Sequence, residues 1–346
     1  MAAVKRKQTT SRRRRSPVIT REATDDGFIY RLGGRKITKR SEIERIEALV
    51  IPPAWVDVEI ARSASAKVLA RGTDAAGRTQ SIYHPAYRRR QERRKYDRML
   101  RFARALPRLR NRVDRDLRRK RLNRDRVTAC VIRLIDLQLF RVGNSAYAKQ
   151  HRSYGVTTLR AEHLTATSSI VEFDFTGKSG KRQQRRVSDA RVARLIAQLL
   201  ELPGSDVFRF FDEDGVVRDV RSHHVNAYVK RFMGEEFTAK DFRTWGGTVL
   251  VATALLGSEL SDASSERESA SVLREAVKAA ADRLGNTPAV TRSAYVDPRV
   301  LAAAEHPDVL ERVRRTRVRP RDGQTAAEQR TVRLLTTMGA ARQPVK

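Results

Sequence analysis

Five polar side chains have the types needed for chemistry on a phosphodiester. They are two arginines, one lysine, one amide and one phenol, found at Arg141, Arg243, Lys178, Asn286 and Tyr295. Guanidinium groups bind phosphate oxygens, an ammonium group protonates a leaving alkoxide, and a phenol attacks phosphorus. The set therefore predicts attack of a tyrosine on a phosphodiester, with the charge supplied by side chains rather than by a metal ion.

Each of these residues, taken singly, has a plainer explanation. A lone arginine is usually a surface residue, a lone tyrosine is usually half-buried packing, and Lys178 between two glycines fits an exposed hairpin tip. The combination favours catalysis. A phenol has an ordinary pKa of about 10 and is mostly protonated at neutral pH, but clustered positive charge favours the phenolate. Two arginines hold a phosphate through paired hydrogen bonds, and a lysine can give up a proton.

The whole chain is strongly basic. Its 346 residues carry a formal net charge of +32, and 40% of them are hydrophobic. This length and composition predict two domains, or one domain with a substantial second lobe, with real cores, and the charge predicts a polyanionic partner. We expect double-stranded DNA as that partner, and no small-molecule substrate.

Cysteine and histidine give no sign of a metal or redox site. Cys130 is the single cysteine and lies in an apolar helical run, which predicts a buried structural thiol. The six histidines lack metal-ligand spacing, so we expect no cofactor and no metal. The sequence contains no apolar run of the roughly 20 residues that span a bilayer. We expect no membrane association and a cytoplasmic, nucleoid-associated protein.

Composition changes along the chain predict four segments. Residues 1–22 read as a basic disordered arm, 23–88 as a β-rich N-terminal DNA-binding domain, 89–338 as a mainly helical catalytic domain, and 339–346 as a frayed tail. In the second segment, strands are expected at 28–32, 56–60, 67–71 and 80–83, and a short helix at 41–49.

The segment 86–126 carries 19 Arg and Lys against 5 Asp and Glu, a net charge of +14. Its helical sequence has a thin apolar stripe at Leu100, Phe102, Leu106, Leu109 and Val113. So much like charge on one segment repels itself unless it is neutralised, so we expect this segment to face DNA. Lys95 and Arg98 are its candidate DNA contacts.

The remaining elements place the five candidate residues. An apolar helix over 127–140 runs into Arg141, and a β-hairpin over 168–175 and 183–187 turns at Lys178. Amphipathic helices are expected at 188–201, 222–234, 240–256 and 264–284. Thr287-Pro288 and Asp297-Pro298 each pair a helix cap with a first-turn proline, which places Tyr295 at the end of a short helix.

Several short blocks follow one another in a fixed order. They are Ile51–Trp55, Gly72–Asp74, Tyr83–Pro85, Arg141–Asn144, Ser153–Arg160 followed by His163, Phe175–Lys178, Lys240–Gly246 and Asn286–Pro288 leading to Tyr295. This succession resembles the type IB DNA topoisomerases of the small poxvirus and bacterial kind, over about residues 27–310.

The resemblance implies an α+β protein with a small β-rich N-terminal domain and a mostly helical catalytic domain of the topoisomerase IB and tyrosine recombinase type. A monomer would close as a clamp around DNA. It would relax supercoiled DNA through a 3′-phosphotyrosyl intermediate and religation, without ATP or an obligatory metal. Tyr295 would be the nucleophile, Arg141 and Arg243 would bind the non-bridging oxygens, and Lys178 would be the general acid.

Asn286 stands where poxvirus members carry histidine and bacterial members often carry asparagine. An amide donates a hydrogen bond but does not shuttle a proton at neutral pH, so Asn286 is expected to stabilise the phosphate. Gln80, Tyr83 and Tyr147 match positions that touch DNA in the family. Ser81 replaces a common aromatic residue, which puts an inherited sequence preference in doubt.

Two alternatives remain open at this point. A tyrosine recombinase uses a similar residue set but typically carries His-x-x-Arg at the second arginine, where this chain has Lys240-Asp241-Phe242-Arg243. A non-catalytic DNA-packaging protein would explain the charge, although it has no use for Tyr295 or Lys178.

Overall fold

The computed structural model describes residues 18–261, 263–319, 321 and 323–341. By its internal contacts the chain divides into two units, residues 1–95 and 96–346, whereas the sequence analysis set the boundary after residue 88. Each unit has its own hydrophobic core, and each is described by itself.

The N-terminal unit is a six-stranded antiparallel sheet with the order β3-β2-β1-β4-β5-β6. Its strands are β1 (Ile19–Thr24), β2 (Gly27–Leu32), β3 (Arg35–Lys36), β4 (Val56–Ile60), β5 (Val68–Thr73) and β6 (Thr79–Tyr83), and its helix is α1 (Arg40–Glu47). Ile46 of the helix packs into the same core as Ile19, Val58 and Ile60 of the sheet. The predicted β-rich domain is confirmed, with strand ends shifted by one or two residues.

The assignment of residues 19–22 to a disordered arm was wrong. They belong to β1, which lies between β2 and β4 and pairs Ile19 with Leu32 on one side and with Ile60 on the other. Ile19 is the one fully buried residue of this strand, so β1 lacks the alternating apolar pattern by which a strand is recognised. Residues 1–17 of the predicted arm lie outside the described residues.

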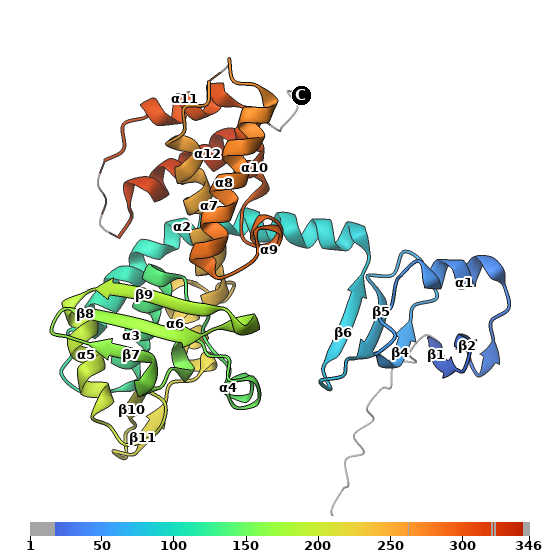
Figure 1. Ribbon diagram of the computed structural model, residues 1–346, viewed down its shortest axis with the longest axis horizontal. Coiled ribbons are helices and arrows are strands. Elements are labelled where there is room, and N and C mark those ends of the chain that lie inside the picture. Colours follow the sequence, from blue (N-terminus) through green and yellow to red (C-terminus); the bar gives the residue numbers. More distant parts are fainter. Residues whose placement is uncertain (1–17, 262, 320, 322, 342–346) are drawn as a thin grey trace, which may run out of the picture. The chain divides into compact units, whose positions relative to one another are not determined.

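The second unit is mainly helical and contains the three-stranded antiparallel sheet β7-β8-β9 (Figure 1). A separate two-stranded sheet is formed by β10 and β11. Helices α3 and α5 cover one face of the three-stranded sheet. The elements of this part of the unit are α3 (Arg124–Gln138), α4 (Ser145–His151), β7 (Leu164–Ala166), β8 (Ile170–Thr176), β9 (Arg182–Ser188), α5 (Ala190–Leu200), β10 (Arg209–Phe211), β11 (Val217–Asp219) and α6 (Ser222–Met233). The predicted hairpin is confirmed as β8 and β9.

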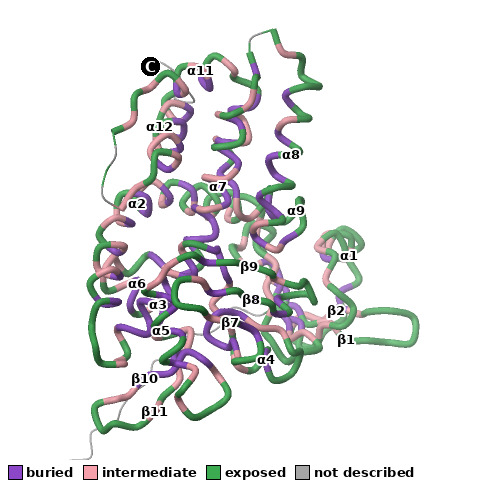
Figure 2. Tube along the Cα trace, turned by 60° about the vertical axis from the view of Figure 1, so that its left-hand side comes forward, coloured by how far each residue is buried: buried purple, intermediate pink, exposed green. Residues whose placement is uncertain are grey.

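The helices that follow pack on one another. They are α7 (Ala239–Leu256), α8 (Glu266–Leu284), α9 (Pro288–Ala294), α10 (Pro298–Ala302), α11 (Pro307–Arg315) and α12 (Ala326–Ala341). Helix α7 contacts α3, α8, α11 and α12, and nearly every residue from Asp241 to Thr248 is buried (Figure 2). A helix segment enclosed in this way serves as a fixed support for the side chains that it carries.

The basic segment forms one long helix, α2 (Pro85–Leu117), followed by the start of α3. The predicted apolar stripe is its buried side, with Phe102, Leu106 and Leu109 each at most 1% exposed. Part of its charge is neutralised by buried acids from distant parts of the chain, because Arg98 pairs with Asp241 and Arg110 pairs with Glu328. A count of charges within the segment leaves out these acids. Self-repulsion alone is therefore a weak reason to place the whole segment on DNA.

The expected frayed tail was wrong for residues 339–341, which complete helix α12. Leu334, Leu335 and Met338 are at most 2% exposed and anchor the last turns of this helix in the core. Cys130 is fully buried as expected, and burial raises the pKa of its thiol to about 12. In the part of the chain that the structure describes, no helix is long and apolar enough to span a membrane.

Candidate active site

Arg141 lies just beyond α3, in a segment whose backbone is fixed by close contacts. Leu139 ends α3 in the left-handed conformation, with φ of 56°, and turns the chain away from the helix axis. The amide of Val156 then donates to the carbonyl of Arg141 at 2.9 Å. Gly155 makes this approach possible, since a Cβ there would lie 2.6 Å from the same carbonyl oxygen. The block around Gly155 therefore positions the first arginine.

Arg243 projects from the second turn of α7 and is only 4% exposed. Its guanidinium donates to the carbonyl of Leu139, at the end of α3, and to that of Leu284, at the end of α8, the latter at 2.8 Å. These carbonyls are the negative ends of two helices and suit a cation. Burial, together with the nearby charge of Arg141, lowers the pKa of Arg243 to about 10, still well above neutrality.

Asn286 joins the two arginines. Its Oδ1 accepts a hydrogen bond from Arg141 at 2.6 Å and a weaker one from Arg243 at 3.5 Å. A guanidinium only donates, so the oxygen must face the arginines and the Nδ2 amino group must face away from them. Nδ2 is buried and has no hydrogen-bond partner within the described residues. Asn286 therefore links the two guanidinium groups through its oxygen and retains one buried amide donor without a partner in the part of the chain that the structure describes.

Tyr295 lies at the C-cap of α9, as expected from the proline-marked start of that helix. Its ring centre is 5.1 Å from the guanidinium carbon of Arg243. Helix α7 also holds its backbone, because the Thr248 hydroxyl contacts the Tyr295 carbonyl at 3.4 Å. Gly247 permits this contact, since a Cβ there would lie 2.8 Å from that carbonyl oxygen. A single helix thus positions both the second arginine and the tyrosine.

The phenol of Tyr295 is easier to ionise than an ordinary tyrosine. Burial alone raises its pKa, but the charge and hydrogen bond of Arg243, helped by Arg141 and Lys240, outweigh burial and lower the pKa below the usual value. The site thus favours the nucleophilic form of the side chain.

Lys178 lies in the loop between β8 and β9 and is exposed. It lines one pocket together with Arg141 and Arg243, so the loop brings the lysine to the arginines. The loop is closed by a 2.8 Å hydrogen bond from the Gly177 amide to the Lys181 carbonyl. The structure therefore brings all five residues together: Asn286 joins the arginines, Tyr295 lies under Arg243, and Lys178 lines the arginine pocket.

A buried ion-pair network supports the helices that carry the arginines. Arg110 of α2 makes paired hydrogen bonds with Asp136 of α3, at 2.7 and 2.8 Å, and with Glu328 of α12, at 2.8 and 2.9 Å. Glu328 also accepts from the Trp245 indole at 3.1 Å, two residues after Arg243. One carboxylate therefore connects α2 and α12 with the helix that carries the second arginine.

The N-terminal DNA-binding candidates lie on β6. Gln80 donates to Asp74 at 2.9 Å, across the turn that precedes the strand. Tyr83 is 40% exposed and packs against the Tyr87 ring, with the ring centres 5.4 Å apart. Gln80 is thus partly engaged, whereas Tyr83 presents an aromatic face to solvent.

The other candidates differ in their surroundings. Tyr147 on α4 is 40% exposed and packs against His151. Lys95 is the last residue of the N-terminal unit. Arg98 donates to the buried carboxylate of Asp241 at 2.6 Å, and this carboxylate also caps the start of α7 by accepting from the Thr238 amide. Arg98 therefore has a structural partner that the local sequence did not reveal.

Sequence reasoning missed two side chains that support the site. Lys181 donates to the Asn286 carbonyl at 2.7 Å, and Glu328 supports α7. The presence of a second lysine in the hairpin turn was a weak sequence signal for Lys181. No pattern in the sequence indicated the role of Glu328. No group of three or more His, Cys, Asp or Glu residues suited to a metal occurs in the described ranges.

Comparisons with known proteins agree with this geometry. Residues 84–309, which contain all five site residues, match the family model of the eukaryotic DNA topoisomerase I catalytic core. Residues 27–74 match that of the bacterial DNA topoisomerase IB N-terminal domain. The chain is 33% identical over 285 residues to the protein named DNA topoisomerase 1B of Acanthamoeba polyphaga mimivirus, covering 80% of this chain and 84% of that protein. The chain therefore belongs to the type IB DNA topoisomerases.

Proposed function

We propose that this topoisomerase relaxes supercoiled DNA by cutting one strand with Tyr295, letting the duplex turn, and resealing the strand. The observation that carries the assignment is the contact of Asn286 with both Arg141 and Arg243, while the Tyr295 ring lies 5.1 Å from the Arg243 guanidinium carbon. Phosphate-binding donors and the nucleophile then meet at one point, as strand transfer requires.

Tyr295 would start the reaction as a phenolate, favoured by its lowered pKa, after its proton passes to solvent. Its oxygen forms a bond to phosphorus while the bond from phosphorus to the 5′ oxygen breaks. The product is a 3′-phosphotyrosyl ester and a free 5′ hydroxyl. Because one phosphodiester replaces another of similar energy, the reverse attack by the 5′ hydroxyl would reseal the strand without ATP.

Arg141 and Arg243 would hold the non-bridging oxygens, and Asn286 would donate a further hydrogen bond to them once its amide turns Nδ2 toward the phosphate. Charge that develops on these oxygens in the pentavalent transition state strengthens such contacts. Losing one donor of this kind typically costs about 10² to 10³ in rate. Since guanidinium groups supply this charge, we propose that the reaction needs no divalent metal.

Lys178 would donate its ammonium proton to the departing 5′ oxygen. An alkoxide is a poor leaving group, and proton transfer in the transition state contributes about 10² to 10⁴ in rate. Lysine suits this role better than arginine, which does not give up a proton at neutral pH. In resealing, the neutral amine would accept the proton of the attacking 5′ hydroxyl.

The DNA contacts are part of the same proposal. We infer a monomeric clamp on duplex DNA, with Gln80, Tyr83 and Tyr147 at the nucleic acid and further phosphate contacts from Lys95 and Arg98. The +32 net charge supports binding of a polyanion, and the DNA substrate implies a cytoplasmic, nucleoid-associated location. Arg98 would reach DNA only if it shared its bond to Asp241.

The test is relaxation of a supercoiled plasmid in EDTA without ATP, comparing the unchanged chain with Tyr295→Phe. We expect relaxation by the unchanged chain alone, and denaturation during the reaction should trap protein on the 3′ end of a nick. Equal relaxation by the phenylalanine variant would refute Tyr295 as the nucleophile. Activity restricted to two specific sites would point to recombination instead.

A further inference from the structure

Strand β9 turns one row of side chains toward the C-terminal end of α8. Lys181, Gln183 and Arg185 alternate along the strand and the loop before it, so they point to the same side. Gln183 and Arg185 pair across the sheet with Phe175 and Phe173, whose side chains are buried. The row therefore lies on the inner face of the hairpin.

Arg185 binds the end of α8 directly. Its guanidinium donates to the carbonyls of Asp282 and Arg283, both at 3.1 Å. The last carbonyls of a helix have no partner within the helix and carry partial negative charge, so a cation is favoured there. The side chain of Gln183 packs beside Gly285, where a Cβ would lie only 2.6 Å from the Gln183 amide nitrogen.

Lys181 completes the row at the active site. Its Nζ donates at 2.7 Å to the backbone carbonyl of Asn286, the residue that joins both arginines. Its own carbonyl accepts from the Gly177 amide and closes the loop that carries Lys178. The lysine loop is thus attached at its base to the arginine centre, while Lys178 itself stays exposed.

We propose that Lys181 is a positioning residue for proton transfer: it docks the loop onto the α8 end, so that Lys178 reaches the departing 5′ oxygen. This inference rests on the proposed role of Lys178 as the general acid. Docking fixes the lysine relative to the phosphate, and a misplacement of about 1 Å can cost about 10² in rate. Loss of Lys181 should therefore slow the step that needs the proton and leave phosphate binding intact.

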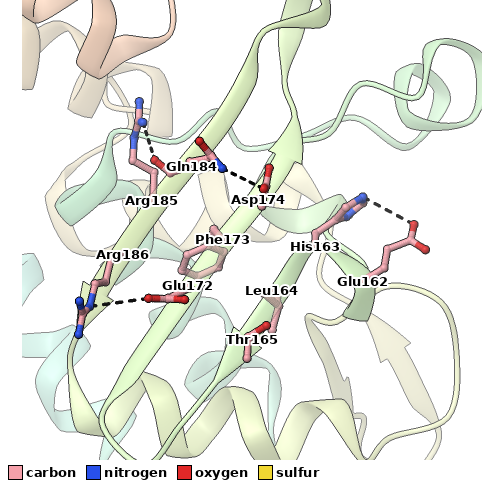
Figure 3. Close-up of a pocket in the computed structure, with 10 residues that line it drawn as sticks. All are labelled: Glu162, His163, Leu164, Thr165, Glu172, Phe173, Asp174, Gln184, Arg185 and Arg186. Carbon is pink, nitrogen blue, oxygen red and sulfur yellow. Dashed lines mark hydrogen bonds and ion pairs between the residues drawn. The ribbon is translucent and has the colours of Figure 1, made fainter.

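The opposite face of the hairpin supplies the control. There Glu172 lies 3.9 Å from Arg186, and Gln184 donates to Asp174 at 3.1 Å (Figure 3). Both members of the first pair are 64% exposed and lie on the outer side of the sheet. Replacing Arg186 removes a cation from the same strand without touching the inner row.

The experiment measures single-turnover cleavage of a duplex oligonucleotide with either oxygen or sulfur at the 5′ bridging position of the scissile phosphate. A thiolate leaves without a proton, since thiols have a pKa of about 8.5, far below that of an alcohol. The sulfur substrate therefore restores the cleavage rate of variants that lack the general acid. It does not restore the cleavage rate of variants that are misfolded. The variants are Lys181→Ala, Lys178→Ala and Arg186→Ala, each also tested for DNA affinity.

We expect Lys181→Ala to cleave the oxygen substrate about 10-fold to 100-fold more slowly, and the sulfur substrate at nearly the unchanged rate. Its DNA affinity should not change, and Arg186→Ala should match the unchanged chain on both substrates. If the sulfur substrate restores the cleavage rate of Lys178→Ala but not that of Lys181→Ala, the docking role is wrong. A lowered DNA affinity of Lys181→Ala would instead make Lys181 a phosphate contact. If sulfur restores neither variant, the general-acid role of Lys178 fails, and the docking role with it.

Discussion

Replacing Glu328 with glutamine should weaken the helical unit and slow DNA cleavage. The carboxylate is 5% exposed and accepts hydrogen bonds from Arg110, Trp245 and Thr325. Breaking a buried ion pair by removing one partner typically costs about 3–5 kcal/mol. Arg110 keeps its two hydrogen bonds to Asp136, and glutamine can still accept from the indole. We therefore expect a smaller loss, about 2–3 kcal/mol of unfolding free energy.

The assay is urea unfolding followed by helical circular dichroism, because helices dominate the second unit. For an m value near 3 kcal/mol/M the midpoint should fall by roughly 0.7–1 M. The matched control is Glu311→Gln, since Glu311 pairs with Arg314 and Arg315 at the surface and is 44% exposed. Its effect should be much smaller, because solvent screens exposed pairs. A loss below about 0.5 kcal/mol for Glu328→Gln, the size of an ordinary surface change, would refute this reasoning.

The dependence on pH gives a second check of the same reasoning. Burial alone raises the pKa of Glu328, but the Arg110 ion pair outweighs burial and lowers the pKa below its usual value of 4.5. A carboxylate with a lowered folded-state pKa stabilises the protein above its unfolded-state pKa, and this stabilisation is lost as the pH falls through the folded-state value. The difference between the unchanged chain and Glu328→Gln should therefore be full at neutral pH and shrink below about pH 4.5.

Three further perturbations test the site. Because Lys240 helps to lower the Tyr295 pKa, Lys240→Met should move the inflection of the cleavage rate to higher pH, and an unmoved pH profile would contradict this electrostatic account. Gly247→Ala places a Cβ 2.8 Å from the Tyr295 carbonyl oxygen. It should slow cleavage by a factor of about 10², whereas DNA affinity, measured in parallel, is retained. Unimpaired cleavage would rule out this steric role. Replacing the exposed arginines 88–90 with glutamine should make the DNA-binding constant less dependent on salt. The slope of its logarithm against the logarithm of salt concentration should decrease in magnitude by about 0.9 for each phosphate that the variant no longer neutralises. An unchanged slope would show that this stretch does not touch DNA.

The sequence was most informative where chemistry restricts the residue type. The roles of nucleophile, general acid and phosphate binder admit few residue types, so Tyr295, Lys178, Arg141 and Arg243 could be proposed for them before their positions were known. Proline and cap signals placed Tyr295 at the end of α9, because these signals act within a few residues. The hairpin that carries Lys178 followed from alternating apolar residues for the same reason.

Local patterns failed where the partner lies far away in the chain. β1 was missed because pairing with β2 and β4, rather than its own pattern, makes it a strand. The charge of α2 was assigned to DNA because Asp241 and Glu328, which pair with Arg98 and Arg110, lie 143 and 218 residues away.

The sequence by itself determined which groups are proposed to do the chemistry, the order of the elements that carry them, and the expectation of a polyanionic partner. Only the tertiary structure decided how those groups act together. It turned Asn286 Oδ1 toward Arg141, 145 residues away, which leaves Nδ2 as the free donor. It also attached the Lys178 loop to α8 through Lys181. The physical reason is that a side chain's direction and protonation are set by neighbours packed around it, and these neighbours come from distant parts of the chain.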